Sequence, residues 1–580
     1  MPARCRRSSL PALHCSKIIN MNLAILTVIF MSLLALGYRF YSRFVEKKYL
    51  LDQELPTPAV LYNDGQDYTP TKPFYLLGQH FSAIAAAGPI AGPIIACQQF
   101  GWLPCLLWIG LGAIFIGAVH DFSALMASVR HNARSIAEIV KHRLGPRAWY
   151  AMMLFIWIAL LYVIMAFTDI TASTFLGKSE ELEGLKVIFN RGGAVAAASV
   201  MYLLLAVVMG LIQRKWNLSL FYQTIIFVPL SLVCVWGGTK ISTLLVFSQS
   251  TWVIAILVYC FVASLMPVWL LLQPRGYLGG FILYIALAIG VIGLFFGNFP
   301  IQQKAFITWH GPGLTGTLFP FLFVTIACGA CSGFHGLVAS GTTSKQIAKE
   351  SHCRPVGYGS MLLEGFVALI ALATVMIAAP GSLNGLKPGK IYGDGIGRFL
   401  TVIIGDKNLV LASTFGAMAF STFVFDTLDV GTRLGRYILQ ELFGLEGRKG
   451  AYLATAITII PPAVLLLLSR EGSWQLFWTL FGTSNQLLAA LSLLCVCIWL
   501  KASGRSFLFA LIPMLFVMVM TVWSLVVQAG WAYQALSRGF VLNATLMNGV
   551  ICLLLLYLAG MMVFEAIRKS KSLEQTEAHV

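Results

Sequence analysis

The chain has 580 residues, of which 58% are hydrophobic and only 11% are charged. Soluble domains carry about 25% charged residues, so this composition excludes a soluble globular protein and predicts a membrane protein. The net charge of +17 does not indicate nucleic-acid binding, because lysine and arginine gather in short loops between apolar segments, as cytoplasmic loops require.

Hydropathy predicts an all-α polytopic membrane protein with about fifteen transmembrane helices. These helices are expected over residues 22–42, 78–98, 103–127, 147–168, 194–213, 219–236, 251–272, 276–296, 317–341, 356–379, 408–428, 451–469, 474–499, 507–527 and 545–565.

The basic loops set the predicted orientation. They follow every second span, from the loop that carries Arg130 to the tail that carries Arg568 and Lys569. Because cytoplasmic loops are rich in Lys and Arg, the C-terminus is predicted to be cytoplasmic and the N-terminus outside. Residues 1–20 are basic and disagree with this placement, so we interpret them as an N-terminal extension ahead of a start at Met21.

Two Gly-Pro pairs interrupt the span over 78–98. Gly88-Pro89 and Gly92-Pro93 lie four residues apart near its middle. Proline removes a backbone donor and clashes with the preceding turn, and glycine lowers the cost of leaving helical geometry. Paired broken helices at membrane depth mark substrate sites in secondary transporters. We therefore interpret these four residues as substrate-binding backbone; close packing through small residues is the alternative.

A second interrupted span is predicted over 317–341, which contains several glycines. It runs from outside to inside, opposite to the Gly-Pro span, as an inverted-repeat transporter requires. A histidine inside an apolar segment is a functional candidate, although a core histidine bonded to a carbonyl is the alternative. The candidate substrate-binding residues of this span are Ser332, Gly333, His335, Ser340 and Thr342.

A strict five-helix repeat would pair the Gly-Pro span with 251–272, which contains Pro267. The pairing with 317–341 assumes two inserted spans. We prefer it because the hydroxyls and His335 supply ligands there.

Other ionisable side chains inside apolar segments are candidates for binding the coupling ion, because such groups are costly in a bilayer. They are His80, Asp121, Glu364 and Asp426. For Asp121, a structural pair with Arg130 is the alternative.

Two further polar groups have structural alternatives. Asp429 precedes Arg433 by four residues, the spacing of a helical ion pair, and we interpret that pair as structural. Asn485 and Gln486 place carboxamides in the middle of 474–499. They are candidate substrate-binding residues, with hydrogen bonding between helices as the alternative.

No cofactor, metal site or enzymatic activity is predicted. Cys328 and Cys331 form a C-x-x-C, but the sequence offers no second pair beside it. Together with His335 they lack a neighbouring carboxylate that would orient a nucleophile. The string over 385–390 has the wrong spacing for a phosphate-binding loop, so a built-in ATP motor is excluded.

Several strings together identify a family. They are Asn63-Asp64-Gly65, Gly78-Gln79-His80-Phe81, the run from Ala87 to Pro93, the run from Gly117 to Phe122, the run from Pro267 to Arg275, the run from Ser332 to Lys345, Val356-Gly357-Tyr358-Gly359, Thr427-Leu428-Asp429 and the run from Phe481 to Gln486. With these strings in this order, the chain resembles the carbon starvation protein A family of bacterial inner-membrane transporters over about residues 21–500.

The resemblance implies secondary active import of pyruvate or short peptides across a bacterial inner membrane during carbon starvation. It also implies coupling to a cation gradient and a five-plus-five inverted repeat. Histidine near carboxylates favours the proton over sodium as the coupling ion. Two departures are Gly276, where the family has an acid, and Gln79, where it has a first histidine.

The resulting division of the chain is an extension over 1–20, a first helix and cytoplasmic loop over 21–75, a transporter core over 76–500 and C-terminal helices with a short cytoplasmic tail over 501–580. The alternative function is a membrane-embedded sensor or scaffold that binds the substrate without moving it. The sequence contains no soluble signalling domain, which argues against that alternative.

Overall fold

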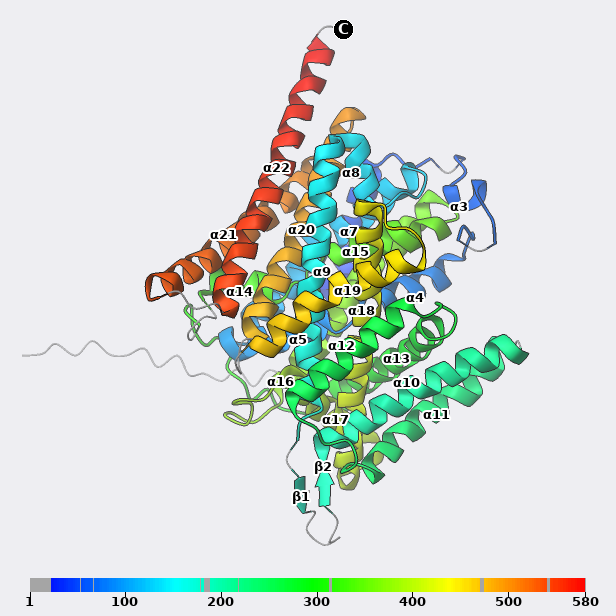
Figure 1. Ribbon diagram of the computed structural model, residues 1–580, viewed down its shortest axis with the longest axis vertical. Helices are drawn as coiled ribbons and strands as arrows, with labels where there is room; N and C mark the ends of the chain where they lie inside the picture. Colours follow the sequence, from blue (N-terminus) through cyan, green and yellow to red (C-terminus); the bar gives the residue numbers. More distant parts are fainter. Residues whose placement is uncertain are drawn as a thin grey trace, which may run out of the picture.

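The computed structural model describes residues 22–52, 54–65, 67–177, 179–181, 188–216, 218–311, 316–469, 474–539 and 543–578. The described chain is helical apart from loops and one two-stranded hairpin (Figure 1). The extension expected over 1–20 lies outside the described residues.

The first half of the chain folds into helices and one antiparallel hairpin. Its elements are α1 (Leu23–Leu36), η1 (Gly37–Tyr41), α2 (Ser42–Lys48), α3 (Pro58–Leu61), α4 (Pro73–Ile84), α5 (Gly88–Phe100), α6 (Trp102–Gly112), η2 (Ala113–Gly117), α7 (Ala118–Arg130), α8 (Ile136–Leu144), α9 (Pro146–Thr174), β1 (Ser179–Glu181), β2 (Ile188–Asn190), α10 (Arg191–Trp216), α11 (Leu220–Lys240), α12 (Gln249–Leu265) and α13 (Leu272–Phe296). In the hairpin, Glu180 lies opposite Phe189.

The second half is helical throughout its described elements. They are α14 (Leu318–Thr325), α15 (Gly333–Val338), η4 (Ala339–Thr343), η5 (Ser344–Gln346), η6 (Glu350–His352), η7 (Arg354–Gly359), α16 (Ser360–Met376), α17 (Pro388–Ile404), η8 (Asp406–Asn408), α18 (Leu409–Phe443), α19 (Gly447–Leu468), α20 (Trp474–Ala502), α21 (Leu508–Ser537) and α22 (Ala544–Ala578).

The all-α, multi-pass architecture is confirmed. In the described part of the chain, 12 helices are long and apolar enough to cross a membrane, and the bent pair α4–α5 makes up to 13. The expected number of about fifteen is not reached on these criteria. Two of the expected spans fall short, because α12 has only 17 residues and the segment from α14 to α15 is interrupted.

Helix α17 corrects the expected order of elements, since no helix was expected between 379 and 408. Lys390, Asp394 and Arg398 lower the apolar character of this segment. Its glycines allow α17 to pack closely on α18: a Cβ atom at Gly393 would lie 2.8 Å from the Cβ atom of Ala417. Close packing through small residues therefore buries this helix, although its mean hydropathy does not predict a membrane span.

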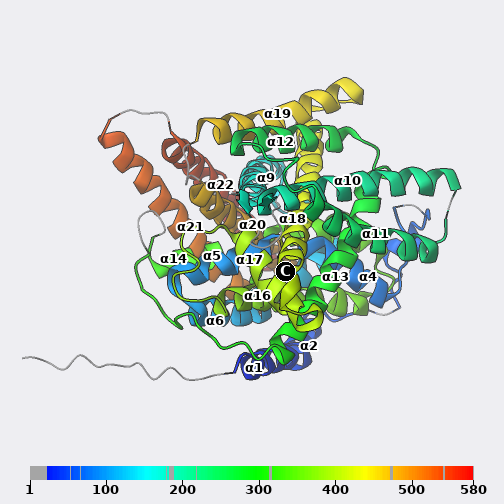
Figure 2. The same ribbon diagram turned by 90° about the horizontal axis from the view of Figure 1, so that it is seen from below.

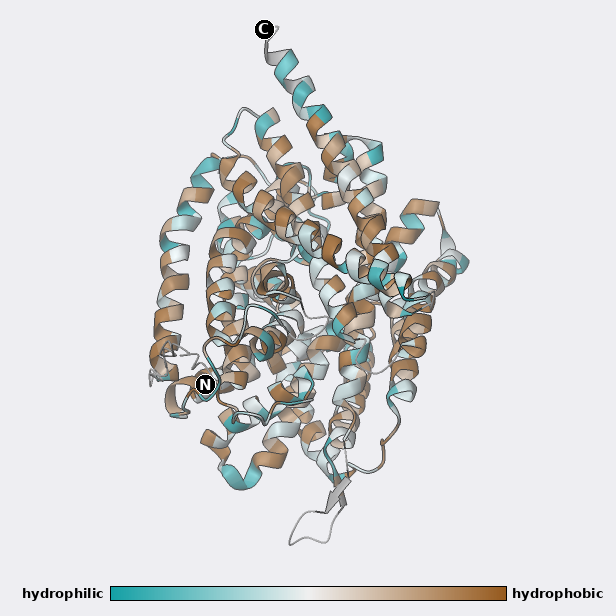
Figure 3. Ribbon diagram, turned by 90° about the vertical axis from the view of Figure 1, so that its left-hand side faces the viewer, coloured by the Kyte–Doolittle hydropathy of each residue, from teal (hydrophilic) through white to brown (hydrophobic). Residues whose placement is uncertain are grey.

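The helices differ in how much of their apolar surface the protein covers. The apolar window of α20 is completely buried and that of α9 is 89% buried, whereas that of α11 is only 22% buried. Figures 1 and 2 show α10 and α11 as a hairpin at the edge of the bundle. In Figure 3 the exposed helices are largely hydrophobic, while the C-terminal end of α22 is hydrophilic. Such apolar outer surfaces are typical of helices that face lipid.

Candidate functional site

The first interruption lies between α4 and α5, where the chain bends by 48°. Residues 85–87 leave the helical path, and Pro89 occupies the first turn of α5, where a missing N–H is tolerated. The predicted break is therefore present, but only the first Gly-Pro pair accompanies it. The second pair does not break the helix, because Pro93 lies inside α5, which continues to Phe100.

The second interruption lies in the segment predicted for it. Helix α14 ends at Thr325, α15 begins at Gly333, and residues 326–332 between them are not helical. Buried polar backbone must be paired inside a membrane protein, so this gap requires partners from neighbouring helices.

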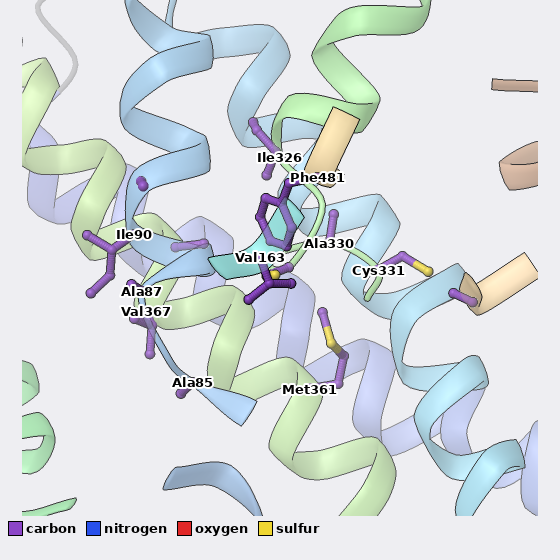
Figure 4. Close-up of a cluster of buried hydrophobic side chains, with 14 of the residues drawn as sticks. Ala85, Ala87, Ile90, Val163, Ile326, Ala330, Cys331, Met361, Val367 and Phe481 are labelled. Carbon is purple, nitrogen blue, oxygen red and sulfur yellow. The ribbon is translucent and has the colours of Figure 1, made fainter. Parts of the chain in front are cut away.

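The two interruptions lie against each other. A Cβ atom at Gly88 would lie 2.4 Å from Sγ of Cys328, and one at Gly92 would lie 2.7 Å from the carbonyl oxygen of Thr325. Figure 4 shows apolar side chains from both segments and from α16 gathered around this contact. The glycines of the two Gly-Pro pairs thus allow the two interrupted segments to approach each other closely. This contact is the close packing through small residues that was the alternative to a substrate-binding role.

The carbonyl groups at the end of α14 receive hydrogen bonds from side chains. Without such donors they would be orphaned at the end of a buried helix. The bonds run from Nε2 of Gln486 to Phe323 (2.9 Å), from Nε1 of Trp478 to Thr325 (3.2 Å) and from Nε1 of Trp108 to Ile326 (3.1 Å). Gln486 therefore acts as a cap for this helix end.

Asn485 binds the other side of the gap. Its Oδ1 atom accepts the backbone N–H of Phe334 at 2.9 Å, and its Nδ2 atom donates to Oγ of Ser332 at 3.0 Å. A Cβ atom at Gly333 would lie 2.5 Å from the Asn485 carbonyl oxygen, so α15 and α20 are in close backbone contact. Asn485 and Gln486 therefore hold both ends of the interruption by hydrogen bonds from α20. This is the contact that the alternative to substrate binding, hydrogen bonding between helices, describes.

His335 lies between two carboxylates. Its Nδ1 atom is 2.9 Å from Oδ2 of Asp121, and its Nε2 atom is 3.1 Å from Oε2 of Glu364. The neighbouring His120 places Nδ1 2.8 Å from Oδ1 of Asp121. All four side chains are buried. We define Asp121, His335 and Glu364 as the acid–histidine–acid cluster; it is formed by α7, α15 and α16.

This cluster corrects the structural alternative for Asp121. Arg130 does not pair with Asp121; it binds Glu350 through two nitrogens, at 2.7 and 2.8 Å. The carbonyl partner expected for His335 in the core-histidine alternative is not observed, because its ring nitrogens face carboxylates. Interacting ionisable groups of this kind, buried beside helix interruptions, are suited to holding and releasing a proton.

Three other predicted residues, His80, Ser340 and Thr342, have contacts outside the acid–histidine–acid cluster. His80 is buried on α4 and contacts Oγ1 of Thr343 at 2.8 Å, while its Nε2 atom has no hydrogen-bond partner among the described residues. The Ser340 hydroxyl donates to Gly336 and accepts the N–H of Ile136, so it serves the backbone.

Thr342 does not have the contacts expected of a substrate-binding residue. Its side chain is exposed, and its hydroxyl donates to the Val338 carbonyl one turn earlier. The structure does not bring the Ser340 and Thr342 hydroxyls to the acid–histidine–acid cluster.

Asp426 belongs to a separate ionic cluster. Arg275, at the start of α13, contacts Asp426 at 2.5 Å and Asp429 at 2.6 Å, and Tyr259 donates to Asp429 at 2.8 Å. The expected Asp429–Arg433 pair is therefore wrong. Arg433 instead donates to two backbone carbonyls at the end of α12.

Arg275 thus has acidic partners although glycine follows it in the chain. They come from α18, more than a hundred residues away. Sequence spacing can indicate an ion pair between residues four apart on one helix. It cannot indicate an ion pair between residues on two different helices. No local pattern in the sequence indicated the contacts made by Arg275, Trp108 and Trp478. For His120, the one available signal was its position next to Asp121.

Comparison with known proteins gives consistent results. A family model described as carbon starvation protein CstA matches residues 22–394 and 387–524. A peptide transporter CstA from Bacillus subtilis is 33% identical, over 95% of this chain and 97% of that protein. The pyruvate/proton symporter BtsT of Escherichia coli is 30% identical, over 85% and 80% of the two chains. The Escherichia coli peptide transporter CstA is 30% identical, over 86% and 79%.

Proposed function

This chain belongs to the carbon starvation protein CstA family, and we propose that it is a proton-coupled importer of pyruvate or short peptides. The relatives are transporters by name, and one of them is a pyruvate/proton symporter. We place it in a bacterial inner membrane with a cytoplasmic C-terminus and an outside N-terminus, serving uptake during carbon starvation. The positive loops support this orientation.

The observation that carries the proposal is the position of the acid–histidine–acid cluster. His335 contacts Asp121 and Glu364 directly after the helix interruption that faces the Gly-Pro break. A proton on this cluster changes the charge at the point where two half-helices meet. Because a buried charge is costly, adding or removing that proton can bias a conformational equilibrium of the surrounding helices.

The capping of α14 favours protons over sodium as the coupling ion. Unwound carbonyls and half-helix C-termini are the usual sodium ligands in transporters with broken helices. Here the carbonyls of Phe323, Thr325 and Ile326 already accept hydrogen bonds from side chains. The acid–histidine–acid cluster beside this gap contains a histidine, whose side chain binds a proton rather than a sodium ion.

The start of α5 is the proposed position for a substrate carboxylate. No side chain caps this helix end, and its partial positive charge favours an anion. A carboxylate would bind the backbone at Gly88 in a conformation in which the contact between Gly88 and Cys328 opens, with Ser332 and Gly333 at the far end of the facing interruption. For a peptide, Glu364 is the acid that can bind the ammonium group.

The two interrupted segments are the proposed counterparts of an inverted repeat. If α12 and the α14–α15 segment also cross the membrane, they would bring the up to 13 spans that length and composition support to fifteen. An odd number is consistent with termini on opposite sides of the membrane. In this arrangement α20 holds one interruption in place while the other half-helices move.

Uptake into liposomes tests the proposal. Purified protein is reconstituted, and labelled pyruvate and a labelled dipeptide are supplied with and without an inward proton gradient. We expect accumulation of one of the two above its external concentration only when the gradient is imposed, and loss of accumulation with a protonophore. Failure of both substrates to accumulate would overturn the proposed function, and accumulation that needs sodium alone would overturn proton coupling.

A further inference from the structure

A cavity lies away from the transport site, between the C-terminal end of α10, the start of α11 and the start of α13. These helix ends are cytoplasmic in the proposed orientation, on which this inference rests. Its volume is about 540 Å³. The lining includes Met209, Arg214, Leu220, Trp269, Gln273 and Pro274. Arg214 is the one charged side chain among them, so the lining is cationic and contains no carboxylate.

The cavity lining combines one cation with polar and apolar side chains. The Arg214 guanidinium lies 4.2 Å from the centre of the Trp269 ring, a cation–π contact that leaves its N–H edge free to donate. Arg214 has no hydrogen bond to an acceptor among the described residues, and its side chain is exposed, as is that of Gln273. Met209, Leu220 and Pro274 also line the cavity, and we call these three residues the apolar wall.

The apolar wall continues onto the outer surface of the protein. Leu220 lines the cavity and is also 65% exposed, and the neighbouring Phe221 is 67% exposed. On α10, Leu211 is 51% exposed. Because α10 and α11 form a hairpin at the edge of the bundle (Figures 1 and 2), this surface faces lipid in the proposed membrane arrangement.

We propose that this cavity binds an anionic phospholipid of the cytoplasmic leaflet, with the phosphate at Arg214 and the upper acyl chain along Leu220 and Pro274. Basic pockets between transmembrane helices on the cytoplasmic side suit anionic headgroups. A chain-bearing lipid matches both Arg214 and the apolar wall, whereas inorganic phosphate matches only Arg214 and a three-carbon acid leaves the apolar wall uncovered. The bound lipid would contact the first turn of α13, which carries Arg275.

Lipid binding to the full-length protein in detergent tests this proposal by native mass spectrometry. The probes are short-chain phosphatidylglycerol and the phosphatidylcholine with the same chains. We expect phosphatidylglycerol to bind about fivefold more tightly, since one arginine near an anionic headgroup is worth about 1 kcal/mol. Arg214→Gln should abolish this preference without affecting folding, because the side chain is exposed.

Lys240→Gln is the matched control, because Lys240 is also a cation near a tryptophan at a helix end, 5.6 Å from the Trp236 ring, but lines no part of this cavity. This variant should keep the wild-type preference. Equal binding of the two lipids to the wild type, or an unchanged preference in Arg214→Gln, would overturn the proposal. Displacement of the lipid by equimolar inorganic phosphate or pyruvate would assign the cavity to a small anion instead. None of these measurements requires transport, so the result is separate from that of the uptake assay.

Discussion

Replacing His335 by glutamine should separate proton coupling from substrate passage. Glutamine has a similar length and can donate to one carboxylate, but it cannot take up a proton. In the wild type, His335 is the group that joins Asp121 at 2.9 Å to Glu364 at 3.1 Å. The variant therefore keeps the position of α15, which Asn485 holds from α20, and loses the titratable link.

The expected magnitude follows from one proton per cycle. For a monoanion carried with one proton, an inward gradient of one pH unit supplies about 1.4 kcal/mol, which sustains about tenfold accumulation. The variant should fall to equal concentrations inside and outside. It should still exchange labelled for unlabelled substrate at equal pH, because exchange does not require net proton movement.

Labelled uptake and exchange in the same liposomes are the two assays. His310→Gln is the control, since His310 is exposed in a loop and should leave both unchanged. Removing one partner of a buried ion pair can cost about 3–5 kcal/mol of folding stability, so Glu364→Gln serves as a second variant if the first folds poorly. Tenfold accumulation by His335→Gln under the pH gradient would refute the reasoning.

Two further predictions concern the packing of the core. Gly482→Ala should sharply lower the melting temperature and the yield, because a Cβ atom there would lie 1.9 Å from the carbonyl oxygen of Val324. The control Gly560→Ala, with open space around it, should leave the melting temperature unchanged in the same assay. Arg275→Gln should destabilise the protein by about 3–5 kcal/mol, because it leaves buried Asp429 without its cation. Adding Asp429→Asn should recover part of the lost melting temperature; a double variant as unstable as the single one would contradict this.

Local patterns in the sequence were sufficient to predict most spans and both interruptions. A run of apolar residues and a Gly-Pro pair carry their physical consequence within a few residues, so hydropathy and backbone chemistry detect them. The exact effect of Pro93 was not predicted, because proline can remain inside a helix when the surrounding structure accommodates it. Helix α17 was missed because its burial depends on glycine packing against α18.

The site was predicted only as separate candidates. Asp121, His335 and Glu364 were each singled out because an ionisable group is costly in a bilayer. Their mutual contact depends on α7, α15 and α16 meeting, and 214 residues separate Asp121 from His335. The same limit explains the wrong partner for Asp429: the spacing to Arg433 was visible in the sequence, whereas the approach of Arg275 was not.

The most direct test of proton coupling is the proton movement that accompanies substrate entry. A pH-sensitive dye inside liposomes reports the internal pH while labelled pyruvate, or the dipeptide if that is the transported substrate, is added outside at equal starting pH. The proposed mechanism predicts internal acidification with about one proton for each pyruvate taken up, and none with His335→Gln. Entry of labelled substrate with no change in internal pH in the wild type would contradict it.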